Sequence, residues 1–234
     1  IGEAMGGLRH LSGEPGRTPV RVGVSIGDSL SALHGVIGVL LALRHREQNR
    51  GAGQQVDVAL YESVFNMMES LIPEYSVFGS VREPAGSSLS GIAPTNAYRC
   101  KDGKYALIAG NGDSIYRRLM EKIERLDLAD DPELAQNDGR VRHVARIDAA
   151  ISAWTAERNL DAVLAALKDA NIPSGKIYDA ADIAADPHYQ ARDMLLASQL
   201  DDGTAVTLPG IVPKLTATPG RVHSRSPTLG QHTD

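Results

Sequence analysis

Residues 21–30 constrain the fold of this chain more than any other part of the sequence. Apolar side chains alternate there as in a strand, Gly27 and Asp28 follow, and helical spacing then runs over residues 30–43. This order predicts an α/β unit in which Asp28 stands where a strand ends and a helix begins. Helix N–H groups and the helix dipole favour an anion at such a junction. From this pattern alone Asp28 is a capping carboxylate or a catalytic one, and capping is the simpler interpretation.

The segments around this junction extend the α/β pattern. Apolar residues cover most of the circumference of the helix at 30–43, which predicts burial on several sides. Residues 55–60 alternate as a second short strand, and helical spacing returns over 61–71. Residues 79–96 are rich in Gly, Ser and Pro and form either a linker or a mobile loop.

A second unit with both helices and strands follows this loop. A turn at 101–104 between two strand-like runs predicts a hairpin, and helical spacing recurs three times before a short strand near 174. The predicted segments are a hairpin over 97–109, helices at 113–125, 141–154, 160–170 and 179–184, and strands near 172–177 and 206–208.

Composition narrows the class of protein. The net charge of −5, with basic residues scattered along the chain, argues against a nucleic-acid partner. A single cysteine, Cys100, excludes an internal disulfide, suits a reducing compartment, and is expected to be an inert thiol. The longest apolar run, 36–43, is too short for a membrane span, so no membrane partner is expected. His34 is expected to pack in its helix, and the other histidines lack metal-ligand spacing, so no metal is expected.

The run Gly-Val-Ser-Ile-Gly-Asp-Ser at 23–29 resembles the active-site segment of class III CoA-transferases. This is the CaiB/BaiF-like family of formyl-CoA transferase and carnitine CoA-transferase. Further segments resemble the same family in the same order along the chain, which makes the likeness much more specific than any one of them. They are residues 5–7, 12–15, 40–46, 53–60, 101–105, 171–175 and 229–233.

The resemblance implies a fold and an assembly. It implies part of a Rossmann-like large domain over 1–78 that carries the nucleophile, and a flexible loop over 79–96. A small α+β domain over 97–192 and a return segment to the large domain over 193–234 complete the expected division. Members of the family form interlocked homodimers, and a cytoplasmic location is expected. The family's N-terminal half, which supplies most contacts to CoA, has no counterpart in these residues, so the CoA-contacting residues are left unassigned.

The resemblance also implies a reaction and two site residues. Asp28 would be the nucleophile that moves CoA from an acyl-CoA thioester to a small carboxylic acid, through aspartyl anhydride and aspartyl-CoA intermediates. Gly91 would belong to the loop that closes over these intermediates. CoA and acyl-CoA enter as substrates, and no permanently bound cofactor is expected.

Two other functions stay open at this stage. An acyl-CoA racemase of the same family would use the matching aspartate with a histidine from an upstream segment. The residues after Asp28, Ser29 and Leu30, differ from the aromatic residue and glycine cluster usual in racemases and favour the transferase. The other alternative is a non-catalytic truncated fragment or dimer scaffold.

Overall fold

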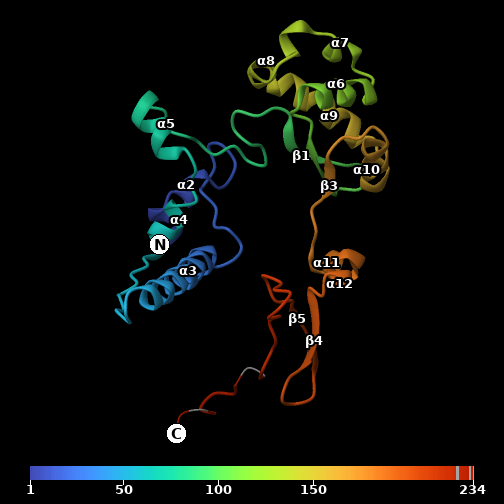
Figure 1. Ribbon diagram of the computed structural model, residues 1–234. Helices are drawn as coiled ribbons and strands as arrows, with labels where there is room; N and C mark the ends of the chain where they lie inside the picture. Colours follow the sequence, from blue (N-terminus) through green and yellow to red (C-terminus); the bar gives the residue numbers. More distant parts are fainter. Residues whose placement is uncertain (225–226, 232, 234) are drawn as a thin grey trace. The chain divides into compact units, whose positions relative to one another are not determined.

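A computed structural model of the chain describes residues 1–224, 227–231 and 233. His232, part of the last segment that resembles the family, lies outside the described residues. The chain divides into two compact units, Ile1–Lys176 and Ile177–Asp234. Figure 1 labels most of their helices and strands. The boundaries expected from the sequence at 78, 96 and 192 stay a prediction.

The first unit opens with five helices. They are α1 (Gly2–Met5), α2 (Leu8–Leu11), α3 (Ile26–Gln48), α4 (Leu60–Phe65) and α5 (Leu71–Phe78). Val64 on α4 is fully buried and packs between two glycines. A Cβ added at Gly6, which ends α1, would lie 2.6 Å from the Val64 Cβ, and one at Gly27 would lie 3.6 Å from a Val64 methyl group. These two close approaches hold the first turn of α3 against α1 and α4.

Helix α3 has a different environment from the one its sequence predicts. The predicted helix is confirmed and runs further in both directions than the apolar pattern, but none of its residues is buried. Within the described chain it packs chiefly on α4 and touches α1, and both of these helices are short. The expectation of burial on several sides is therefore wrong for these residues, because two short helices cannot cover so wide an apolar face.

Helix α3 also has the length and the apolar composition of a membrane-spanning helix. With 23 residues and a mean hydropathy of 1.7, it is the helix among the described residues that is long and apolar enough to cross a membrane. The sequence-based expectation rested on unbroken apolar runs and missed this helix, since glycines and small polar residues interrupt its apolar pattern. Core helices of water-soluble proteins meet the same criterion, so this property does not identify a membrane helix.

The two strands predicted in the first 60 residues are wrong. Residues 20–25 and 52–59 form no strand, and α3 and α4 follow them directly. Apolar alternation describes how side chains are distributed, whereas a strand also needs a neighbour to complete its ladder of hydrogen bonds. Neither segment pairs with another strand in the described part of the chain, so the α/β order predicted for this region does not form there.

The sheet of the first unit is antiparallel, with the order β1-β2-β3. Strands β1 (Thr95–Arg99) and β2 (Tyr105–Ala109) form the predicted hairpin, and β3 (Ser174–Lys176) pairs with β2 through Ala106 opposite Lys176. The remaining elements are α6 (Asp113–Lys122), α7 (Leu126–Ala129), a 3-10 helix η1 (Pro132–Leu134), α8 (Asn137–Arg142), α9 (Val144–Ala156) and α10 (Leu160–Asp169). Figure 1 shows α9 and α10 beside this sheet; α9 packs on β1, and α10 on β2 and β3.

The hydrophobic core of the first unit lies between this sheet and its helices. Most of the fully buried apolar side chains of the chain belong to it, including Tyr116, Leu119 and Ile151. Cys100 is buried in the same core, and burial, followed by the nearby Asp102, raises the pKa of its thiol. A buried thiol with a raised pKa is a poor nucleophile, as expected for this cysteine.

The second unit is small and has little buried apolar surface. It contains α11 (Ala180–Ala185), α12 (Pro187–Ala191) and an antiparallel hairpin of β4 (Leu195–Gln199) and β5 (Ala205–Pro209). Asp179 begins α11 with a reciprocal capping box. The Asp179 side chain accepts a hydrogen bond from the Asp182 N–H, and the Asp182 side chain accepts one from the Asp179 N–H. The predicted short helix and the predicted strand near 206–208 are both confirmed.

Candidate active site

Asp28 lies in the first turn of the longest helix of the chain. Helix α3 starts at Ile26, so Asp28 is its third residue, and Ser25 occupies the N-cap position. The Asp28 side chain is exposed and makes no hydrogen bond or ion pair with any residue that the structure describes. The capping role, which was the simpler interpretation of the sequence, is therefore not found. The helix dipole still favours a carboxylate at this position.

A hollow of about 290 Å³ opens beside Asp28. It lies at the start of α3, next to α1, α2 and the first residue of α4. Its lining residues are Ile1, Gly2, Glu3, Ala4, Arg9, Arg21, Ser25, Gly27, Asp28 and Leu60. Two guanidinium groups and two carboxyl groups thus share one small hollow with an apolar wall.

Neighbouring side chains hold Arg21 at the rim of this hollow. Its Nε lies 3.7 Å from Oε1 of Glu3, and its Nη2 donates to Oγ of Ser25 at 3.5 Å. The Glu3 side chain is only 12% exposed, and its Oε2 is buried with no hydrogen-bond partner among the described residues. The buried Glu3 carboxylate attracts the Arg21 guanidinium more strongly than an exposed one would, because ion pairs gain strength away from bulk water.

The arrangement suits attack by a carboxylate on an activated acyl group. The Asp28 carboxylate is exposed, so an acyl carbonyl can reach it. The N–H groups of the first helical turn supply positive potential where negative charge develops in such a reaction. The side chains lining the hollow include no histidine or cysteine, and its nucleophilic groups are the carboxylates of Asp28 and Glu3 and the hydroxyl of Ser25.

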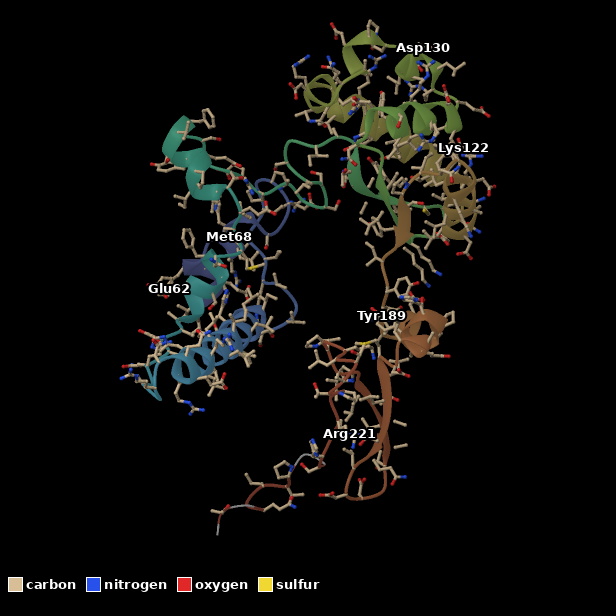
Figure 2. The ribbon with its side chains drawn as sticks, viewed as in Figure 1. Glu62, Met68, Lys122, Asp130, Tyr189 and Arg221 are labelled. Carbon is tan, nitrogen blue, oxygen red and sulfur yellow. The ribbon has the colours of Figure 1, made fainter. Side chains whose placement is uncertain are left out.

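His34 lies in a different hollow from Asp28. That second hollow, also of about 290 Å³, follows the groove between α3 and α4, and its lining includes His34, Asp57 and Glu62. Figure 2 labels Glu62 on α4. The Nδ1 atom of His34 is buried without a hydrogen-bond partner among the described residues. The structure therefore does not bring His34 into the hollow that holds Asp28.

Gly91 occupies a backbone conformation that glycine favours. Its φ is +80°, and an added Cβ would meet no atom within 4 Å, so conformation rather than space accounts for glycine here. Asn137 anchors the residues around it, since its Nδ2 donates to the Gly91 carbonyl at 2.9 Å and its Oδ1 accepts from the Ala93 N–H at 3.2 Å. Gly91 does not line the hollow beside Asp28, and its role in a closing loop stays a prediction.

The sequence did not point to three charged residues of the hollow, Glu3, Arg9 and Arg21. Arg21 opens the stretch that singled out Asp28, so its position in the sequence was a usable signal. Glu3 and Arg9 reach the hollow only because α1 and α2 fold back beside α3 and α4, and no spacing in the sequence reports that contact. Among the described residues no group of three or more His, Cys, Asp or Glu side chains is placed to hold a metal ion.

Comparison with known proteins identifies the family. The family model described as CoA-transferase family III matches residues 1–233 of the chain. The chain belongs to CoA-transferase family III. The resemblance found in the sequence is thereby confirmed, together with the mixed α and β fold class that it implied.

Individual relatives agree with the family model. The chain is 42% identical over 232 residues to the succinyl-CoA–D-citramalate CoA-transferase of Chloroflexus aurantiacus, covering 99% of this chain and 58% of that protein. It is 31% identical to the succinyl-CoA:mesaconate CoA-transferase of Haloarcula marismortui, with 99% and 58% covered. A CaiB/BaiF family protein from Brucella suis has a similar structure, with a TM-score of 0.83 and 30% identity over 99% of this chain and 60% of that one. The chain therefore spans somewhat more than half the length of these relatives.

Proposed function

We propose that the protein containing this chain transfers CoA from an acyl-CoA thioester to a carboxylic acid, with Asp28 as the nucleophile. The observation that supports this most directly is the place of Asp28, exposed in the first turn of α3 and lining a hollow with two arginines. The relatives named above transfer CoA from succinyl-CoA to citramalate or mesaconate. Dicarboxylic acids with four or five carbons, and their CoA thioesters, are accordingly the proposed substrates.

The proposed reaction divides one exchange into four balanced steps. The Asp28 carboxylate attacks the thioester carbonyl, so that a C–O bond forms, the C–S bond breaks, and CoA thiolate leaves a mixed anhydride. The thiolate then attacks the Asp28 carbonyl, which gives aspartyl-CoA and releases the donor acid. The acceptor carboxylate attacks aspartyl-CoA to form a second anhydride and thiolate. Attack of that thiolate on the acceptor's acyl carbon gives the product thioester and restores Asp28. No net proton or water is consumed.

Charge development favours the hollow over bulk solvent for these steps. Each addition places negative charge on a carbonyl oxygen near Asp28, where the N–H groups of the first turn of α3 supply positive potential. Water competes with the thiolate for both anhydrides and for aspartyl-CoA. A loop that closes over the intermediates would limit that hydrolysis, and we assign this role to the loop containing Gly91.

The proposal extends to the assembly and its substrates. We propose a homodimer in the cytoplasm that takes CoA as a substrate and needs no resident cofactor. Two relatives are named as the alpha and beta subunits of succinyl-CoA–L-malate CoA-transferase. A paired architecture is therefore consistent with the names of these relatives, and sedimentation of the whole native protein would measure the subunit number.

Exchange of labelled CoA tests the role of Asp28. In the whole native polypeptide containing these residues, Asp28→Asn should lower the exchange of labelled CoA between succinyl-CoA and an acceptor acid by about 10³-fold or more. Asp161→Asn is the matched control, since Asp161 is also an exposed aspartate in the first turn of a helix, α10. Retained exchange in Asp28→Asn, with folding intact by circular dichroism, would exclude Asp28 as the nucleophile.

Deuterium incorporation separates the transferase from a racemase. A racemase exchanges the α-proton of its acyl-CoA with solvent, whereas the proposed transferase breaks no C–H bond. Incubation of the acyl-CoA in deuterated water without an acceptor acid should therefore leave its α-carbon unlabelled. Rapid labelling at that carbon would favour the racemase instead.

A further inference from the structure

We propose that Arg9 and Arg21 bind the second carboxylate of a dicarboxylic substrate and so select dicarboxylic over monocarboxylic acids. The inference rests on the proposed function, in which the first carboxylate of the same molecule reacts at Asp28. It assigns the choice of substrate to two side chains that contact the end of the molecule that does not react.

Both arginines line the hollow that contains Asp28, although they come from different elements. Arg9 lies on α2, and Arg21 lies in the segment before α3. Arg9 has no hydrogen bond or ion pair with any residue that the structure describes. Its guanidinium is exposed, so its donors are available to a ligand. A free cation in a hollow beside the proposed nucleophile is suited to an anionic part of the substrate.

Arg21 differs from Arg9 in being held in place. Contacts with Glu3 and Ser25 use its Nε and Nη2, and its side chain remains 59% exposed. A guanidinium carries five N–H donors in a planar fork, so these contacts leave other donors for a ligand. A fixed arginine beside a free one can receive the two oxygens of one carboxylate from both sides.

The charges in the hollow explain why a second carboxylate needs these arginines. Asp28 and Glu3 together carry two negative charges that oppose an approaching dianion, and Arg9 and Arg21 balance them. A monocarboxylic acid of the same length has an apolar end and gains nothing from a guanidinium. The arginines therefore favour the diacid and leave the reaction at the near carboxylate unchanged.

Acceptor selectivity is the quantity to measure. Succinate and butyrate have the same number of carbons and differ in the distal carboxylate, so they form a matched pair of acceptors. In the whole native polypeptide, Arg9→Gln and Arg21→Gln should each lower kcat/KM for succinate by about 10- to 100-fold, the usual effect of losing a charged hydrogen bond. The value for butyrate should stay within about threefold of the original. Arg46→Gln is the control, since Arg46 lies in the last turn of α3 and outside the hollow.

The phosphates of CoA could attract the same arginines, and inhibition by free CoA distinguishes the two ligands. Carboxylate binding predicts an inhibition constant for CoA that the two substitutions leave unchanged. A raised constant for CoA with unaltered succinate-to-butyrate selectivity would overturn the proposal in favour of phosphate binding. Equal losses for both acids would also overturn it, because they would indicate a structural role or a role at the reacting carbonyl.

Binding without turnover keeps this test separate from the test of Asp28. Calorimetry on the Asp28→Asn protein should show tighter binding of succinate than of butyrate, and Arg9→Gln or Arg21→Gln should abolish the difference. If the arginine substitutions leave that difference intact, the inference fails even where the Asp28 mechanism holds. If Asp28→Asn retains full exchange activity, the proposed function fails whatever the selectivity.

Discussion

Replacing Arg140 by leucine should strongly destabilise the first unit, because its buried guanidinium is the donor to several backbone carbonyls. Arg140 lies on α8, is fully buried, and its guanidinium stands 4.9 Å from the centre of the Tyr116 ring. The side chain connects several loops of the core. It donates to the carbonyls of Ala93 at 3.0 Å, Leu134 at 3.1 Å, Ala135 at 3.0 Å and Asn111 at 2.7 Å, and to the carboxylate of Asp113 at 2.7 Å.

The size of the effect follows from the carbonyls that would lose their donor. A buried acceptor left without a partner costs about 1–3 kcal/mol. At the middle of that range the two buried carbonyls bonded to Arg140, those of Ala93 and Leu134, give about 4 kcal/mol. The carbonyls of Ala135 and Asn111 are only partly buried and can regain water, so they contribute less. The Asp113 side chain is 65% exposed and regains water, so its contribution is smaller. A loss of about 4 kcal/mol is a large part of the stability of an ordinary domain.

Urea unfolding measures this loss of stability. It can be monitored by the fluorescence of Trp154, the only tryptophan of the chain. Trp154 lies on α9 and packs against the same core. Arg117→Leu is the control: Arg117 is 57% exposed on α6 and pairs with Glu121 and Asp130, the latter labelled in Figure 2. Loss of those exposed pairs should cost less than about 1 kcal/mol. Equal midpoints and slopes for the two variants would refute the view that Arg140 satisfies buried carbonyls.

Two further predictions concern packing and pH. Gly6→Ala should destabilise the chain by about 1–3 kcal/mol in urea unfolding, because its Cβ would lie 2.6 Å from Val64, whereas Gly35→Ala, in open space on α3, should stabilise it slightly. Equal effects at the two glycines would contradict this account. The Arg125 guanidinium lowers the pKa of Asp127 to about 2, so its stabilisation is present above about pH 4 and is lost as pH falls through about 2. Titration by NMR should show a pKa near 2 that rises toward about 4 in Arg125→Gln, and an unchanged value would refute the pairing.

Local patterns predicted the second half of the first unit well. The hairpin of β1 and β2 and the helices α6, α9 and α10 lie within a few residues of their predicted positions, and so does the capped helix α11 of the second unit. Each depends on hydrogen bonds and turns between residues close in sequence, so the pattern that predicts it also stabilises it. The helix at 141–154 was the exception in detail, since the structure interrupts it at His143 between α8 and α9.

Patterns that depend on distant partners were less informative. Alternation at 21–26 and 55–60 was compatible with strands, but no neighbouring strand completes them in the described residues. The charge on Arg140 gave no sign of its burial, which arises where four backbone carbonyls converge. An arginine is expected at the surface unless such acceptors surround it.

The sequence by itself determined that Asp28 precedes a long helix and that the chain resembles class III CoA-transferases. Those properties belong to a contiguous run of residues and to ordered segments along the chain. Only the tertiary structure decided that Asp28 is free of a capping bond and shares a hollow with Arg9 and Arg21. The physical reason is that the electrostatic environment of a carboxylate depends on which charges lie near it in space, and packing of α1 and α2 beside α3 and α4 brings those charges together.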